Sequence, residues 1–114
     1  MRLWIRRAIL VLAAVCVPLL AAYSQAGSFE QAVAAYQRGD YKTALRLYRV
    51  LATQGSALAQ NNLGLMYAQG RGVPSNDAQA VHWYRRAAEQ GLARAQFNLG
   101  LRYARGRGVA GNDA

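Results

Sequence analysis

Cysteine is almost absent from this sequence, since Cys16 is the only one in 114 residues. The chain therefore cannot form the intramolecular disulfides on which many small domains outside the cytosol depend. Histidine is equally scarce, with His82 alone. Because no cysteine and histidine residues have the spacing of a zinc or iron site, we expect neither a metal nor a cofactor.

Acidic residues are also few: five stand against fourteen basic ones, a net charge of +9. Asp77 and Asp113 occupy equivalent positions at expected helix starts, where a carboxylate favours the helix dipole. No serine begins an S-x-x-K motif, and the glycines of "GRGV" lack the G-K-[ST] ending of a phosphate loop. These absences predict a protein that is not an enzyme.

The N-terminus has the features of a secretory signal peptide in the usual order: positive charge, an apolar run and small residues before the cleavage site. Three arginines precede the apolar run "AILVLAAVCVPLLAA", and small residues at Ser24 and Ala26 suit cleavage after Ala26. The run has 15 residues, whereas a membrane span needs about 20. We therefore expect residues 1–26 to be removed and the protein to be exported, to the periplasm. The alternative is an inner-membrane protein that retains residues 1–26 as an anchor.

The remaining chain repeats itself with a period of 36 residues. Residues 57–78 and 93–114 share 16 identities in 22 positions, including "NLG" and "GRGV" in both copies. A fixed period of this length is typical of stacked repeats. Apolar residues within the period follow helical spacing, so the sequence predicts an all-α fold of stacked antiparallel helix pairs, an α-α solenoid.

Helix boundaries follow from local signals in each repeat. Asn76 suits an N-cap, three residues before Gln79, and Gly55 and Gly91 suit the left-handed position that ends a helix. Gly64 and Gly100 lie in the middle of expected helices, where glycine costs up to about 1 kcal/mol. We expect a close approach of the partner helix at this position, with Ala80, Ala87 and Ala88 as its small complement and Trp83 and Tyr84 supplying bulk.

The pattern "A-x-A-Q-x-N-L-G-x-x-Y-x-x-G-x-G-V", followed by "N-D-x-x-x-A-x-x-W-Y-x-x-A-A-x-Q-G", resembles the Sel1-like repeat, a relative of the tetratricopeptide repeat. The resemblance gives a complete repeat at residues 57–92 and a partial one at 93–114, whose second helix is missing. Residues 28–56 match loosely and resemble a tetratricopeptide-like capping helix pair. Helix 93–104 would then expose an apolar side, covered by further chain, by a partner or by self-association.

In related tetratricopeptide proteins the first helices of the repeats line a concave, partner-binding surface. If Ala59, Leu63 and Tyr67 face the core, a neighbouring stripe faces this surface. The predicted partner-binding residues are Asn61, Asn62, Leu65, Gln69, Arg94, Phe97, Asn98, Leu101 and Arg105. Asparagines could clamp a peptide backbone. The alternative, which the sequence supports equally, is that Asn62 and Asn98 form hydrogen bonds with a neighbouring repeat or helix.

Two arginines, Arg71 and Arg107, occupy the same place in successive "GRG" loops. Stacking would align them as a basic loop ladder; the alternative is a pair of solvated loop residues. Arg85 and Arg86 beside "HWY" could suggest nucleic-acid binding, but helical spacing turns Trp83 and Tyr84 toward the core. We therefore expect no nucleic acid as a partner.

The expected function is that of an exported, non-catalytic protein-protein interaction scaffold. Its concave groove would bind a peptide or protein, and the net positive charge of the chain favours an acidic partner. One alternative is an envelope enzyme acting on β-lactams or cell-wall polymers. Another is a membrane-anchored assembly factor, and contact with a membrane is expected only if residues 1–26 are retained.

Overall fold

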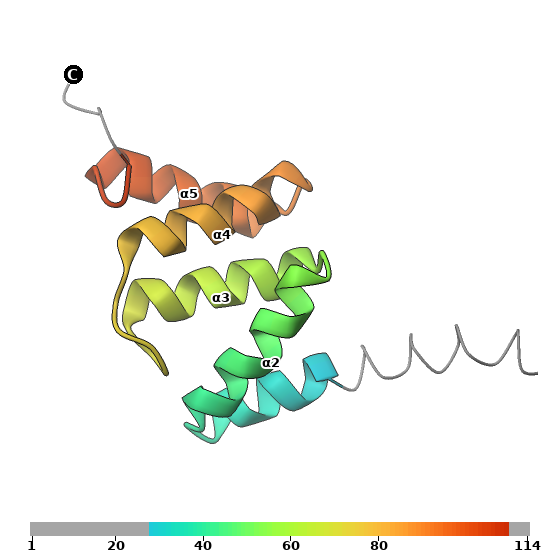
Figure 1. Cartoon of the computed structure of the whole chain (residues 1–114). Coiled ribbons are helices and arrows are strands. Elements are labelled where there is room, and N and C mark those ends of the chain that lie inside the picture. Colours follow the sequence, from blue (N-terminus) through green and yellow to red (C-terminus); the bar gives the residue numbers. More distant parts are fainter. Residues whose placement is uncertain (1–27, 110–114) are drawn as a thin grey trace, which may run out of the picture.

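The computed structural model of the chain describes residues 28–109, and the proposed signal peptide lies outside this range. Residues 28–37 are helical, followed by α2 (Tyr41–Thr53), α3 (Ala57–Gln69), α4 (Asp77–Glu89) and α5 (Ala93–Arg105). The described part of the chain contains no strand. The helices stack in chain order from residues 28–37 to α5 (Figure 1). The prediction of an all-α solenoid is confirmed.

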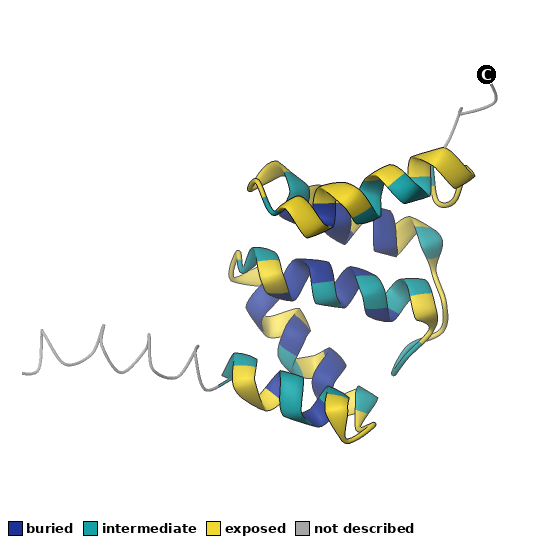
Figure 2. Ribbon diagram, turned by 180° about the vertical axis from the view of Figure 1, so that it is seen from behind, coloured by how far each residue is buried: buried dark blue, intermediate teal, exposed yellow. Residues whose placement is uncertain are grey.

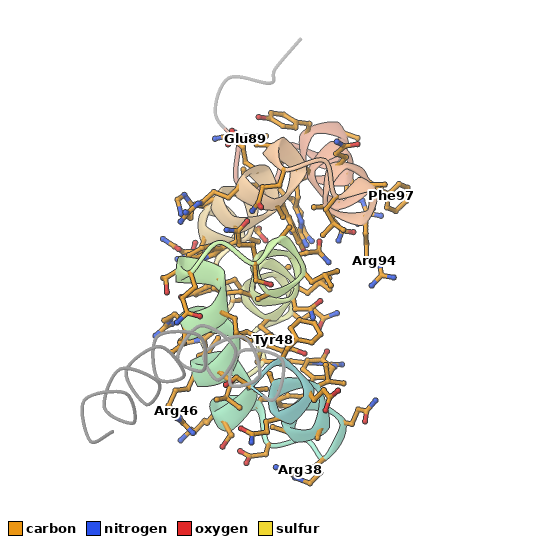
Figure 3. All side chains as sticks on the ribbon, turned by 90° about the vertical axis from the view of Figure 1, so that its right-hand side faces the viewer. Arg38, Arg46, Tyr48, Glu89, Arg94 and Phe97 are labelled. Carbon is orange, nitrogen blue, oxygen red and sulfur yellow. The ribbon has the colours of Figure 1, made fainter. Side chains whose placement is uncertain are left out.

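Each helix packs mainly against the next along the chain: α2 against α3, α3 against α4, and α4 against α5. The first members of the pairs (residues 28–37, α3 and α5) lie toward one side, and α2 and α4 lie toward the other (Figure 3). This separation follows from the antiparallel pairing, because successive pairs stack with the same orientation. The described residues include no helix both long enough and apolar enough to span a bilayer.

The helix ends follow the local sequence signals. Asn76 accepts a hydrogen bond from the Gln79 backbone N–H at 3.0 Å, which confirms the predicted cap of α4. Ser56 caps α3 in the same way through the backbone N–H of Ala59, at 3.2 Å. Gly55 and Gly91 have φ of +101° and +91°, as predicted for glycines that end helices.

The core combines alanines, which allow close packing of the helices, with larger aliphatic and aromatic residues. Its buried apolar residues are Ala32, Ala35, Ala44, Leu45, Tyr48, Leu51, Ala52, Ala59, Leu63, Met66 and Trp83. Tyr84 is also buried, so the predicted inward orientation of Trp83 and Tyr84 is confirmed. Ala95 is the one buried residue of α5, and most of this helix is exposed or half-buried (Figure 2).

The close approach predicted at Gly64 is present, and its main complement is an aromatic ring. A Cβ atom at Gly64 would lie 2.7 Å from both Cδ1 and Cε1 of Tyr84 and 3.2 Å from the carbonyl oxygen of Ala80. The α3–α4 pair therefore depends on the missing side chain. At Gly100, the equivalent position in α5, nothing in the described structure lies within 4 Å of such a Cβ atom.

Candidate partner-binding groove

A cavity of about 330 Å³ opens between the helical segment 28–37 and α3. Its lining is largely apolar and aromatic, with two amide side chains: Val33, Tyr36, Gln37, Tyr48, Asn62 and Leu65. Tyr48 reaches it from α2 and lies between the first helix and α3 (Figure 3). A concave apolar surface with a few polar groups is the usual form of a binding site. We call this cavity the groove pocket.

Tyr48 forms a rigid wall of the groove pocket. Its side chain is 3% exposed, and its ring meets the Phe29 ring edge-on, with 6.0 Å between centroids. Burial raises the pKa of the Tyr48 phenol above its ordinary value of 10.0, and a hydrogen bond with the Asn62 side chain partly opposes this effect. Asn62 is therefore held in place at the edge of the pocket by a buried hydroxyl group.

Tyr36, on the other wall, is fixed by the last residue of α3 and by a residue of the loop that follows it. Its hydroxyl group donates to Oε1 of Gln69 at 3.2 Å and accepts from a guanidinium nitrogen of Arg71 at 2.5 Å. The Arg71 guanidinium also lies 5.5 Å from the Tyr36 ring centroid and 5.3 Å from that of Tyr41. These cation–π distances indicate that Arg71 helps to shape the pocket wall.

The basic loop ladder predicted from Arg71 and Arg107 stays a prediction, and the structure gives the two arginines different surroundings. Arg71 is half-buried against two tyrosine rings of the preceding helix pair, whereas Arg107 is exposed. The loops themselves pack alike, since Gly72 approaches the backbone of Tyr41 and Gly108 approaches that of Asp77. Arg71 therefore has the Tyr41 ring beside it, whereas the equivalent position next to the Arg107 loop holds Asp77.

Asn61 does not lie on the partner-binding surface, where the sequence predicts it. Its side chain is buried, with 1% exposure, and its Oδ1 accepts a hydrogen bond from Nδ2 of Asn98 at 2.9 Å. Asn98 is thus engaged between repeats, as the alternative for this residue proposed. Asn62 instead lines the groove pocket. Asn62 and Asn98 occupy equivalent repeat positions but have different surroundings. Asn98 of α5 lies next to α3, whereas Asn62 of α3 lies next to residues 28–37.

The other predicted binding residues lie at both ends of the first-helix face. Leu65 lines the groove pocket, and Gln69 is exposed and bonded to Tyr36. On α5, Phe97 is 67% exposed and extends outward on the same side as Arg94 (Figure 3). Leu101 is half-buried and Arg105 is exposed in the last turn. The structure thus gathers Asn62 and Leu65 in the pocket, and it places Arg94, Phe97, Leu101 and Arg105 on α5.

Four pocket residues were missed in the sequence: Val33, Tyr36, Gln37 and Tyr48. Val33, Tyr36 and Gln37 lie in residues 28–37, which match the repeat only loosely. The 36-residue period therefore does not predict which side of that helix faces the groove. Tyr48 lies 36 residues before the core residue Tyr84. Both tyrosines are indeed buried, but Tyr48 also contacts the pocket.

Three contacts between successive pairs recur with the 36-residue period. Arg49 donates to the Tyr67 hydroxyl at 2.9 Å, and Arg85 donates to the Tyr103 hydroxyl at 2.6 Å. Gln60 donates to the Ala52 carbonyl at 3.0 Å, and Gln96 donates to the Ala88 carbonyl at 3.2 Å. Gly108 approaches the backbone of Asp77 as Gly72 approaches that of Tyr41. The repeat is therefore a repeat of inter-pair contacts as well as of helices.

An ion pair that does not recur joins the last two helices. Arg102 contacts the Asp77 carboxylate at 2.8 Å, with side-chain exposures of 15% and 39%. Met66 occupies the equivalent position in α3 and is fully buried. The same repeat position thus contributes an apolar contact within the core and an ion pair at α5.

Alkaline pH is expected to destabilise the fold through Tyr48 and Tyr84. Burial raises the pKa of both phenols above 10.0, and nearby Arg102 partly opposes this effect at Tyr84. Below pH 10 both phenols are neutral in the folded and unfolded states, so their contribution is fully present. As the pH rises above 10 the unfolded chain ionises first, and the free energy of unfolding falls.

Urea unfolding at pH 9 and at higher pH values measures this effect. The double variant Tyr48→Phe, Tyr84→Phe is expected to lose less stability between these pH values than the unmodified chain. An equal loss in both proteins would contradict the assignment to these two phenols.

The fold and groove define a helical-repeat solenoid with a concave surface. The Sel1 repeat family matches residues 29–56, 57–92 and 93–114, so this chain belongs to the Sel1-repeat proteins. Proteins with this repeat are generally interaction scaffolds, and the fold is typically non-catalytic. The resemblance inferred from the sequence is confirmed.

Two solved structures are similar to this chain over most of its length. One is c5321, a protective antigen present in uropathogenic Escherichia coli strains that displays an SLR fold, with 36% identity and a TM-score of 0.70 over 75% of this chain. The other is a Sel1 repeat protein from Oxalobacter formigenes, with 36% identity and a TM-score of 0.70 over 78% of this chain. The matches span 19% and 38% of those proteins. A search of curated proteins found no match.

Proposed function

We propose that this chain is a non-catalytic scaffold of the periplasm whose first-helix face binds an extended segment of a partner protein. The observation that carries this proposal is the groove pocket, with apolar walls and with Gln37 and Asn62 at its edge. The pocket would take one apolar side chain of the partner. The two amides could donate to and accept from the partner's backbone on either side of that residue.

Charge supports an acidic partner. Helix α5 carries Arg94, Arg102 and Arg105 and no acidic residue, and Arg94 and Arg105 are exposed. Such a surface attracts an acidic segment and speeds its association. The exposed Phe97 adds an apolar contact on this helix. The proposed ligand is therefore an extended segment with an apolar anchor residue and neighbouring aspartates or glutamates.

The N-terminal sequence supports the proposed location. Residues 1–26 have the charge, apolar run and small residues of an exported precursor. Mass measurement of the protein from an envelope fraction tests this part of the proposal. A chain beginning at Gly27 is expected in the soluble periplasmic fraction, whereas an intact N-terminus in the membrane fraction would favour the anchored alternative.

Selection from a random peptide library tests the groove directly. Selected peptides are expected to carry an aromatic or aliphatic residue beside acidic ones, and their affinity is measured by fluorescence anisotropy. Leu65→Arg, which places a charge in the pocket lining, is expected to weaken binding at least about 10-fold, because burying an unpaired charge costs more than 1.4 kcal/mol.

Val50→Arg is the matched control. Val50 is an aliphatic residue of α2 that is 49% exposed and does not line the pocket. Circular dichroism checks that both variants fold. Equal binding by the Leu65→Arg and Val50→Arg proteins would overturn the proposal that the pocket is the binding site.

A further inference from the structure

The second helices of two repeats, α2 and α4, present basic side chains to solvent. Positions i, i+4 and i+7 share one face of a helix, and on α2 these positions hold Lys42, Arg46 and Arg49. On α4, Arg85 occupies the position 36 residues after Arg49, and Arg86 follows it. All five side chains are exposed. We call them the outer basic face: Lys42, Arg46, Arg49, Arg85 and Arg86.

The outer basic face lies on the side of the molecule away from the first helices. Arg46 of α2 points away from the side on which Arg94 and Phe97 of α5 lie (Figure 3). Helix α2 lies between residues 28–37 and α3 in the stack, and its basic side chains are exposed even so (Figure 1). The face is therefore a side of the stack, separate from the groove pocket.

Two of these arginines are held in the same way, one in each repeat. Arg49 donates to the Tyr67 hydroxyl at 2.9 Å, and Arg85 donates to the Tyr103 hydroxyl at 2.6 Å. Each bond occupies one guanidinium nitrogen, and a guanidinium has further N–H donors. Both charges are thus positioned in advance and still have donors for an anion, which lowers the entropy lost on binding.

Few carboxylates or apolar groups accompany these charges. Helix α2 contains no acidic residue, and of the two in α4, Asp77 is paired with Arg102 at 2.8 Å. Glu89, the other one, lies in the last turn of α4. Val50, 49% exposed, is the large apolar residue beside the face. The face is therefore suited to attract anions by charge rather than to insert apolar side chains.

We propose that the outer basic face binds the surface of an anionic phospholipid bilayer. Arginine pairs with phosphate through two parallel hydrogen bonds, and a bilayer presents phosphates to the whole face at once. Single-stranded nucleic acid fits less well, because its bases need exposed aromatic rings on which to stack. Trp83 is only 8% exposed, and the Arg86 guanidinium lies 5.2 Å from its ring centroid.

This contact differs from the membrane contact expected from the sequence, because it does not require residues 1–26. It also goes beyond the proposed peptide binding and does not depend on it. A protein held through the outer basic face would keep the groove pocket directed away from the bilayer, available to a partner protein.

Co-sedimentation with vesicles tests the proposal. Vesicles of phosphatidylglycerol and phosphatidylcholine in equal amounts are compared with vesicles of phosphatidylcholine alone. The full chain and the chain that begins at Gly27 are both measured, which separates any binding by residues 1–26. Both are expected to prefer the anionic vesicles and to bind less as salt is added. If the chain that begins at Gly27 is folded by circular dichroism and shows no such preference, the proposal is overturned.

Removing charges from the face should weaken this binding. The triple variant Lys42→Gln, Arg46→Gln, Arg86→Gln is expected to bind the anionic vesicles at least about 10-fold more weakly, because each basic residue near the bilayer adds to the attraction. Circular dichroism checks that the variant folds, and selected groove peptides should bind it as they bind the unmodified chain.

The matched control removes three charges from α5 and the loop that follows it: Arg94→Gln, Arg105→Gln, Arg107→Gln. These arginines are exposed and lie outside the outer basic face. The control should lose no more than about 2-fold, since distant charges are screened. Equal losses in the two triple variants would overturn the proposal. So would displacement of the chain from the vesicles by DNA at equal phosphate concentration, because nucleic acid would then be the preferred partner.

Discussion

Gly64→Val is expected to lower the free energy of unfolding by about 3 kcal/mol, because overpacking of a close contact costs amounts of this order. The new side chain would begin 2.7 Å from two carbon atoms of the Tyr84 ring. That ring is 1% exposed, so it has no free space into which to move. For a domain of this size, the midpoint of thermal unfolding should fall by about 10–20 °C.

Gly100→Val is the control for this prediction, since it makes the same change at the equivalent repeat position. Nothing in the described structure lies within 4 Å of a Cβ atom there. Valine and glycine have similar, modest helix propensities, so the stability should change by less than about 0.5 kcal/mol. Thermal denaturation followed by circular dichroism measures both variants. Similar losses at the two sites would mean that the packing of Tyr84 on Gly64 is not the cause.

Gly72→Ala is expected to have a comparable effect, about 3 kcal/mol, for two reasons that add. Gly72 has φ of +74°, which L residues rarely adopt, and a Cβ atom would lie 2.6 Å from the Tyr41 carbonyl oxygen. The carbonyl oxygen of Tyr41 belongs to the backbone at the start of α2, so the clash can be removed only if the loop or the helix moves. The movement would also separate Arg71 from the two tyrosine rings.

Gly91→Ala separates the two contributions. Gly91 has φ of +91° but nothing within 4 Å of a Cβ atom, so only the backbone strain of about 1 kcal/mol is expected. Chemical denaturation measures the difference between the two variants. If Gly72→Ala cost no more than Gly91→Ala, the contact with Tyr41 would not contribute to the stability of the loop.

The candidate site could be predicted only in part. Asn62 and Leu65 were found because the period assigns one face of α3 to the core and the neighbouring face to the groove. Asn61 was misplaced because its burial depends on α5, which lies beside it. The contact of Arg71 with Tyr36 and Tyr41 could not be read from the period, because Asp77 occupies the position equivalent to Tyr41 in the next repeat.

The 36-residue period and the glycine and asparagine signals determined the helices, their ends and the all-α repeat fold. These properties depend on residues that are close together in the sequence and on the backbone preferences of each residue type, and both can be read from the sequence. Only the tertiary structure decided that Gly64 receives a tyrosine ring while Gly100 is open, and that Leu63 is buried while Leu99 is half-exposed. Identical residues differ in this way because burial depends on the neighbouring helix: α4 covers this face of α3, and within residues 28–109 no helix covers the same face of α5.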